Sequence, residues 1–322
     1  MKKMDDFKNI YGQDLAIQIL KSSIAKQHIS PAYLFSGPEG VGRRKTAKIF
    51  VKAILNNNIN KELTKRKIES NNHPDLLWIE PSYTVQGKII SRQQAKSESI
   101  SIKTPPKIRL NQIKEIIEFL GKKPLESARK IVVIEDIETM NESASNALLK
   151  TLEEPNTGIF ILITQRSEKL LSTIRSRCQI VPFIRLSNNQ VNKIIQKLEV
   201  IQKIPDIPSE TIKDLIAFSD GSPGKYLTNV DYWLDISSTL REKLDFKVTS
   251  QIAVLKLAKE ITDELNIEQQ LWLINFQQNR IWKKKNNPTM VKKLEELRRQ
   301  LLSYVQPRLA WEVTLLEISF SN

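Results

Sequence analysis

Two continuous apolar runs limit the folds open to this chain more than any other feature. They read KIVVIED at residues 130–136 and GIFILIT at residues 158–164, and neither alternates between apolar and polar residues. Strands of this kind are buried on both faces, as in a parallel sheet covered by helices on each side. The helical pattern ESASNALLKTLEEP separates the two runs, and Pro155 ends it. The sequence therefore predicts a doubly wound α/β domain.

The same alternation of helices and strands extends from residue 13 to about residue 185. Helical periodicity occurs at 14–27, 43–57 and 108–121, and short strand-like segments occur at 32–36, 75–81 and 179–183. Residues 82–107 interrupt this pattern, because they are polar, rich in Ser and Lys, and without helical period. We expect them to form a long surface loop or a partly disordered insertion.

The remainder of the chain is predicted to be helical. Short helical segments between residues 187 and 229 indicate a small helical domain. Longer amphipathic segments from residue 230 to residue 322 indicate a second helical domain. Three domains are therefore expected, at 1–186, 187–229 and 230–322.

A glycine-rich loop, GPEGVGRRKTA at residues 37–47, follows the strand-like run AYLFS. A working P-loop reads G-x-x-x-x-G-K-[ST]: its backbone N–H groups cradle phosphates, its Lys reaches the terminal phosphates, and its hydroxyl holds Mg²⁺. Gly37 and Gly42 keep this frame, with Gly40 between them, but Arg43 and Arg44 replace the Lys and the Ser/Thr. The sequence predicts a degenerate nucleotide site.

Neighbouring residues do not restore the missing groups. Lys45 and Thr46 lie two residues further along the expected helix, which turns them by roughly 200° away from the phosphates. Arg43 is able in principle to contact a phosphate with its guanidinium fork, but no residue at the right place can hold Mg²⁺. We expect no ATP hydrolysis here, and a site that is empty or binds nucleotide weakly.

Acidic residues end the buried strand at 130–136, where a nucleotide site of this type needs them. They are Glu135, Asp136 and Glu138. In such a site, one acid holds the metal's water and a second acid activates water. The order here is Glu then Asp, whereas the usual Walker B motif reads Asp then Glu, so each role would fall to a side chain of altered reach. Carboxylates at this place also often cap the next helix. The sequence leaves both roles open.

Composition narrows the classes of partner. The chain has 322 residues with 50 Lys and Arg against 36 Asp and Glu, a net charge of +14. This charge suits an anionic partner such as nucleic acid, but it is scattered as on a solvated surface, so it does not assign DNA binding by itself.

The single cysteine, Cys178, excludes an internal disulfide. Without a membrane-length apolar run or a signal-peptide core at the start, we expect a cytoplasmic protein with no membrane partner.

Seven stretches, taken together, resemble one protein family. They are GPEGVG at 37–42, NHPDLLWIEP at 72–81, IRLNQIKEIIEFL at 108–120, NALLKTLEEP at 146–155, TIRSRCQ at 173–179, GSPGKYL at 221–227 and PRLAWEVTLLEI at 307–318. They are similar to bacterial DNA polymerase III clamp-loader subunits of the AAA+ class, and among these to the delta-prime type. The resemblance covers almost the whole chain except 82–107. It implies a P-loop α/β domain, a small helical lid domain and a C-terminal helical collar.

The resemblance also implies roles for individual residues. The Ser-Arg-Cys motif at 176–178 supplies an arginine finger, Arg177, to the ATP site of a neighbouring subunit, where a guanidinium stabilises transition-state charge. The alternative is that Arg177 forms a salt bridge within its own domain. Arg175 is a second, weaker candidate for the finger.

Further positions depart from the family's pattern. Thr164 and Gln165 fall at the sensor 1 position, and Lys225 stands where ATP-binding relatives carry the sensor 2 Arg, whose bidentate phosphate contact Lys cannot make. Family members usually carry a four-cysteine zinc module before the HPD motif. Residues 55–73 contain no cysteine, and His73 is their one histidine. We therefore expect no zinc. The segment either keeps the shape of the module or is remodelled.

Taken together, the resemblance implies a largely non-catalytic ring subunit that helps load the sliding clamp onto primed DNA. Its partners would be tau/gamma-like and delta-like subunits, with the clamp and DNA reached through the complex. No cofactor is expected in this subunit, since ATP and Mg²⁺ would be bound by its neighbours.

Two other functions remain open at this stage: an ATP-hydrolysing tau/gamma-type motor, and a basic AAA+-like protein that binds DNA directly. The Arg43–Arg44 pair argues against the motor, as does the expected lack of a long extension after the last helices. Trp272, Trp282 and Trp311 are either core residues or anchors of the collar.

Overall fold

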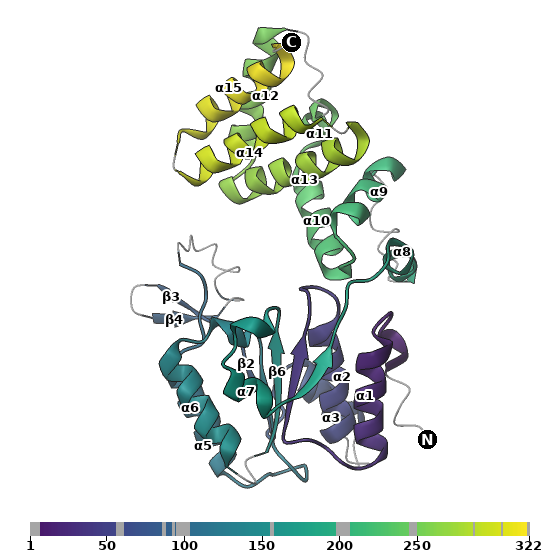
Figure 1. Cartoon of the computed structure of the whole chain (residues 1–322), viewed down its shortest axis with the longest axis vertical. Helices are drawn as coiled ribbons and strands as arrows, with labels where there is room; N and C mark the ends of the chain where they lie inside the picture. The colour runs from purple at the N-terminus through teal and green to yellow at the C-terminus, as the bar shows by residue number, and fades with distance from the viewer. Residues whose placement is uncertain are drawn as a thin grey trace. The chain divides into compact units, whose positions relative to one another are not determined.

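The computed structural model describes residues 7–55, 61–85, 88–91, 94, 104–154, 158–197, 207–244, 250–285, 287–303 and 305–320. The chain divides into two compact units, Met1–Gln190 and Val191–Asn322. The first unit contains a sheet with helices, and helices make up the described part of the second (Figure 1). The predicted α/β domain followed by helical segments is confirmed.

A five-stranded parallel sheet forms the centre of the first unit, in the order β2-β5-β6-β1-β7. Its strands are β1 (Ala32–Ser36), β2 (Leu76–Ile79), β5 (Ile131–Ile134), β6 (Ile159–Thr164) and β7 (Gln179–Pro182). β6 separates β1, which leads into the glycine loop, from β5, which leads into the acidic residues. Because the strands are parallel, both segments emerge at the same carboxyl edge, where α/β sheets bind ligands.

Helices cover both faces of this sheet (Figure 1). One face is covered by α1 (Asp14–Ala25), α2 (Arg43–Leu55) and α3 (Lys61–Glu69), and the other by α5 (Leu110–Gly121), α6 (Glu142–Glu153) and α7 (Ser172–Ser176). α3 is not foreseen from periodicity, because it is polar apart from Leu63 and the buried Ile68. It shows that the cysteine-free segment before β2 is partly helical.

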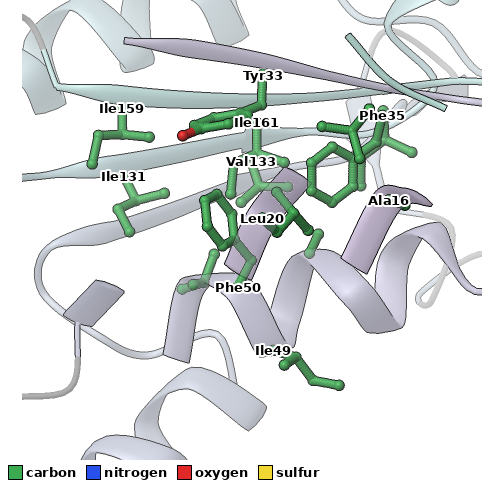
Figure 2. Close-up of a cluster of buried hydrophobic side chains, with 14 of the residues drawn as sticks. Ala16, Leu20, Tyr33, Phe35, Ile49, Phe50, Ile131, Val133, Ile159 and Ile161 are labelled. Carbon is green, nitrogen blue, oxygen red and sulfur yellow. The ribbon is translucent and has the colours of Figure 1, made fainter. Parts of the chain in front are cut away.

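Successive residues of each strand enter opposite cores, which explains the continuous apolar runs. In β1, Tyr33 and Phe35 point toward α1 and α2, whereas Leu34 packs against the helices of the other face. Figure 2 shows the first of these cores, where Tyr33 and Phe50 meet edge to face with ring centroids 5.0 Å apart. Burial on both faces fixes the strand register, since a slip by one residue would exchange the two sets.

The segment at 82–107 begins with regular structure, so the expectation of a loop is wrong for its first residues. β3 (Tyr83–Val85) and β4 (Lys88–Ile90) form an antiparallel pair, and Ser82 forms a bridge with Lys107. The Arg109 guanidinium stabilises the bridge between Ser82 and Lys107, because its Nη1 donates to the Ser82 carbonyl at 2.8 Å. β-branched and aromatic residues favour such local pairing. Residues 92–93 and 95–103 lie outside the described residues.

The second unit continues from α8 (Asn188–Lys197), which spans the junction of the two units. Its further helices are α9 (Ser209–Phe218), α10 (Pro223–Asp235), α11 (Ser238–Lys243), α12 (Gln251–Glu264), α13 (Ile267–Lys285), α14 (Pro288–Leu302) and α15 (Pro307–Phe320).

The amphipathic stretch at 231–244 lies in two separate helices, α10 and α11. The Ser237 side chain accepts a hydrogen bond from the Leu240 amide and so begins a new helix. The predicted domain start at residue 230 lies inside α10, and the division of this region into lid and collar stays a prediction.

Two of the three tryptophans considered above are core residues. Trp311 is fully buried and donates to Gln270 Oε1 at 2.9 Å, and Trp272 is buried and donates to Asn229 Oδ1 at 3.0 Å. Trp282 is 57% exposed.

Among the described helices, none combines the length and apolarity needed to cross a membrane.

Candidate functional site

The glycine loop connects β1 to α2 and adopts a backbone that requires glycine. Gly37 has φ +156°, and a Cβ there would lie 2.2 Å from the Phe183 carbonyl oxygen. Gly40 and Gly42 also have positive φ, at +73° and +106°. The Gly37 amide donates to the carbonyl of Thr164, the last residue of β6. The loop predicted from the sequence is therefore present and is held against β6.

Gln13 fixes the other side of the loop. This side chain is buried, accepts from the Ile184 amide at 3.0 Å and donates to the Ile184 carbonyl at 2.8 Å. Its Nε2 also reaches the Val41 carbonyl within the loop, at 3.4 Å. Sequence reasoning missed Gln13, since a single Gln before a helix carries no motif and its partners lie 28 and 171 residues away.

Three consecutive cations, Arg43, Arg44 and Lys45, occupy the first turn of α2, and this turn has no acidic residue. The N-terminal end of a helix carries a partial positive charge, so this arrangement is electrostatically unfavourable unless anions lie nearby. In a working P-loop, substrate phosphates supply those anions. Here the chain supplies carboxylates of its own.

Arg44 forms the most direct of these contacts. Its Nε lies 3.0 Å from Glu135 Oε1, and its Nη2 lies 2.5 Å from Glu80 Oε1. The guanidinium also lies over the Trp78 ring, 5.7 Å from the centroid. Arg44 therefore stands at the sequence position of the metal-binding hydroxyl and is bound to the first acidic residue after β5.

Glu135 is enclosed by its partners. Its side chain is nearly buried, and Oε1 accepts from Trp78 Nε1 at 2.6 Å in addition to the Arg44 contact. Burial raises the pKa of this carboxyl, and the Arg44 charge opposes that shift only in part. Arg44 Nη1 also donates to Glu135 Oε2 at 3.4 Å, so both oxygens of the carboxylate face Arg44. These residues do not fit a Mg²⁺ ion, since a guanidinium cannot ligate a cation.

Arg43 is buried in the same region, with 6% of its surface exposed. Burial lowers its pKa, while the carboxylates of Asp136, Glu138 and Glu39 act in the opposite direction. Its Nη1 has no hydrogen-bond partner within the described residues. Arg43 is thus a desolvated cation whose charge is partly offset by the acidic groups around it.

The two remaining acidic residues hold local structure. Asp136 has φ +45° and precedes the short 3₁₀ helix η2 (Ile137–Thr139), and its carbonyl accepts from Thr139 Oγ1. Glu138 Oε1 accepts from the Gln165 amide at 2.9 Å, so it ties this turn to the end of β6. The cap of α6 is the Asn141 side chain rather than one of these carboxylates.

The sensor positions implied by the resemblance lie in different units. Thr164 is fully buried at the end of β6, beside Ser36 of β1, and its hydroxyl accepts from the Arg166 amide at 3.0 Å. Lys225 lies in the first turn of α10, where its amide donates to the Ser222 side chain. The roles of Thr164 and Lys225 stay predictions.

Arg177 follows the last residue of α7 and is exposed. Its Nη2 lies 2.7 Å from Glu153 Oε1, and its Nη1 donates to the Thr173 carbonyl at 3.0 Å. The predicted alternative, a salt bridge within the domain, is present in the chain alone. Both side chains are only partly buried, and exposed pairs of this kind contribute little to stability.

Asp75 is a structural residue that sequence reasoning missed. It is fully buried and accepts hydrogen bonds from the amides of Leu125, Glu126 and Ser127 and from the Ser127 hydroxyl. The neighbouring His73 accepts from the Asp75 amide through Nδ1, and burial lowers the pKa of this imidazole. In the sequence, the available sign of this cluster was an Asp immediately before the apolar run LLWI.

Comparison with known proteins gives a consistent result. Residues 12–187 match the family described as DNA polymerase III, delta subunit, and residues 189–318 match the cyanobacterial DNA polymerase III delta prime, C-terminal domain. DNA polymerase III subunit delta' of Bacillus subtilis (strain 168) is 34% identical over 177 residues, 53% of this chain and 47% of the relative. DNA polymerase III subunit tau of the same organism is 28% identical over 274 residues, 84% of this chain and 45% of the relative. The chain thus spans about half the length of these relatives.

A solved structure shares the fold. The DNA polymerase III gamma subunit-related protein of Thermotoga maritima MSB8 superposes with a TM-score of 0.50 at 18% identity, covering 93% of this chain and 98% of that one. This likeness agrees with the AAA+-type fold that the sequence implied. The chain belongs to the DNA polymerase III delta subunit family.

Proposed function

We propose that this chain is a delta-prime-like subunit of the DNA polymerase III clamp loader. In this role it is a largely non-catalytic ring member that helps load the sliding clamp onto primed DNA in the cytoplasm. It donates Arg177 to the ATP site of a neighbouring subunit, and tau/gamma-like and delta-like subunits are its partners. ATP and Mg²⁺ are bound by those neighbours.

The observation that carries the proposal is the ion pair between Arg44 and Glu135. A P-loop enzyme needs a hydroxyl at the position of Arg44 to hold Mg²⁺, and the metal neutralises much of the charge on the transferring phosphoryl group. A guanidinium repels the metal and also occupies the Glu135 carboxylate. Hydrolysis at this loop would require both contacts to be broken.

Arg177 supports the second half of the proposal. Among the described residues, a surface ion pair and one carbonyl are the contacts that hold its exposed guanidinium, so a phosphate of a neighbouring subunit is able to reach it. An arginine finger supplied in trans typically raises hydrolysis about 10³–10⁵-fold. The contribution to catalysis would then be made entirely at another subunit's site.

The rival function is an ATP-hydrolysing tau/gamma-type motor. The match to subunit tau over 84% of this chain favours it, and Arg43 and Arg44 argue against it. Binding of Mg-ATP by the purified chain separates the two. Direct DNA binding, the third possibility, would appear as affinity of the isolated chain for DNA that falls steeply with salt.

The test is calorimetric titration of the full chain with Mg-ATP, beside an Arg43→Lys, Arg44→Thr double variant and an Arg44→Ala variant. We expect no binding heat from the natural chain. Binding by the double variant but not by Arg44→Ala would show that the lost hydroxyl and Lys account for the difference. Metal-dependent binding and turnover by the natural chain would overturn the proposal.

The finger is tested in the reconstituted complex. Arg177→Ala should lower ATP turnover by at least about tenfold, toward the range given for a lost finger. Arg175→Ala tests the second candidate for the finger, and Lys150→Ala, which removes an exposed positive charge from α6, is the matched control. Equal activity of the Arg177→Ala complex and the natural complex would refute the role of Arg177.

A further inference from the structure

We propose that Glu153 is the positioning residue of the arginine finger. In this inference, which rests on the proposed function, Glu153 holds the Arg177 guanidinium in the orientation that a neighbouring phosphate meets. Glu153 is not a catalytic residue, because it acts only through Arg177.

The geometry fixes the guanidinium from two sides. Glu153, the last residue of α6, accepts from Nη2 at 2.7 Å, and the carbonyl of Thr173 in α7 accepts from Nη1 at 3.0 Å. Both helices are anchored in the same core, through Leu148 of α6 and Ile174 of α7. The two acceptors therefore move together, and the plane of the guanidinium is set by the folded unit.

The hydrogen-bonding capacity of Arg177 allows both partners at once. A guanidinium has five N–H donors, and the contacts to Glu153 and Thr173 use two of them. Within the described part of the chain, three N–H groups, including that of Nε, are left for a phosphate. Arg177 can thus bind the neighbour's phosphate without leaving Glu153.

The benefit of this contact is orientation rather than stability. The side chains of Arg177 and Glu153 are 38% and 46% exposed, so water screens the attraction between them. An unrestrained Arg loses the freedom of a long side chain when it docks, and a guanidinium held beforehand has already lost it. A small misplacement of a catalytic group costs up to about a hundredfold in rate.

The experiment measures steady-state ATP turnover by the reconstituted clamp-loader complex carrying single variants of this chain. Glu153→Ala should lower kcat about tenfold with little change in KM, because the guanidinium loses its orientation but not its charge. Glu153→Gln should keep most of the activity, because the amide oxygen still accepts from Nη2. Glu142→Gln, at the other end of α6, is the matched control and should be unchanged.

A double variant separates positioning from a general structural effect. Glu153→Ala should have no further effect on kcat once Arg177 is replaced by Ala, whereas a structural defect would lower kcat in both backgrounds. Assembly is checked by gel filtration. Should Glu153→Ala fail to assemble, Glu153→Asp, which keeps the charge but withdraws the carboxylate, is expected to show the same loss of kcat.

The outcomes distinguish this inference from the proposed function. Normal or raised turnover with Glu153→Ala, beside a large loss with Arg177→Ala, would overturn the positioning role and leave the finger intact. Normal turnover with Arg177→Ala would overturn both.

Discussion

The Nε atom of Arg44 lies 3.0 Å from Oε1 of Glu135, although 91 residues separate them in the sequence. The pair joins the first turn of α2 to the end of β5, the two segments that surround nucleotide and metal in a working P-loop. The guanidinium of Arg44 therefore contacts the carboxylate that follows β5.

Removal of Arg44 should destabilise the first unit. Arg44→Ala leaves the nearly buried Glu135 carboxylate with Trp78 as its one hydrogen-bond donor among the described residues, and we expect the free energy of unfolding to fall by about 1–2 kcal/mol. The value is below that of a fully buried pair because Arg44 is half exposed and screened by water. Urea unfolding followed by circular dichroism measures it, and the double variant Arg44→Ala, Glu135→Gln should recover most of the loss.

The same variant should show a defined pH dependence. Burial raises the pKa of Glu135, so the folded chain binds this proton more readily than the unfolded chain does. The cost of the unpaired charge is complete above the folded pKa, declines as the pH falls below it, and is absent below the unfolded pKa. The deficit of Arg44→Ala should therefore shrink between pH 7 and acidic pH, and a deficit that grows with acidity would contradict this.

Asp75 should stabilise the folded chain at neutral pH and lose this effect in acid, although its pKa is shifted in the opposite direction to that of Glu135. Burial by itself would raise its pKa, but the hydrogen bonds from Leu125, Glu126 and Ser127 lower it below the ordinary value. Its contribution to stability is present above the unfolded pKa and is lost as the pH falls through the lower folded pKa. Asp75→Asn should cost about 2–3 kcal/mol at neutral pH, with a smaller deficit below about pH 4. Glu118→Gln, an exposed change on α5, should alter urea unfolding little at either pH.

If the chain is a clamp-loader subunit as proposed, an apolar stripe on α15 should be needed for its association with the proposed partner subunits. Leu309, Val313 and Phe320 are exposed and spaced along one side of the helix, opposite the buried Trp311 and Leu315. Val313→Lys should weaken co-elution with partner subunits in gel filtration while the circular dichroism spectrum stays unchanged. Gln300→Lys adds the same charge at an exposed polar position of α14, and it should leave co-elution intact. Equal behaviour of the two variants would contradict a binding role for this stripe.

Cys178 should be unreactive in the folded chain. Burial raises the pKa of its thiol to about 12, and only the thiolate reacts with disulfide reagents. Relative to an ordinary thiol, the thiolate fraction at pH 8 falls about a thousandfold. A thiol-disulfide assay should give slow release in buffer and rapid release in urea. Fast reaction in buffer would show that the residue is accessible.

Local patterns in the sequence were enough to predict much of this fold. The continuous runs gave β5 and β6 because residues such as Val133 and Ile134 serve opposite cores, and the glycines gave the loop because only they adopt its positive φ angles. The position of Arg177 on an exposed turn also agrees with its motif. These features are encoded within a few neighbouring residues.

The remaining features depend on partners far apart in the chain. Arg44 meets Glu80 and Glu135, and Gln13 meets Ile184, only after the sheet has assembled. The carboxylates after β5 were expected to hold a metal or cap a helix, whereas Glu135 holds Arg44 and Glu138 holds the Gln165 amide. A periodicity of 2 or 3.6 residues carries no information about such pairs, and three-dimensional structure is needed to find them.

The cations in the first turn of α2 also bear on how ligands affect the stability of this protein. An ordinary P-loop protein leaves this charge to be neutralised by nucleotide, so its melting temperature rises with nucleotide concentration by mass action. In this chain the counter-ions are Glu80 and Glu135, which are covalently part of the molecule and present at a fixed ratio. We expect the melting temperature of the first unit to be the same in nucleotide-rich and nucleotide-poor conditions, because the charge of this turn is balanced without a ligand.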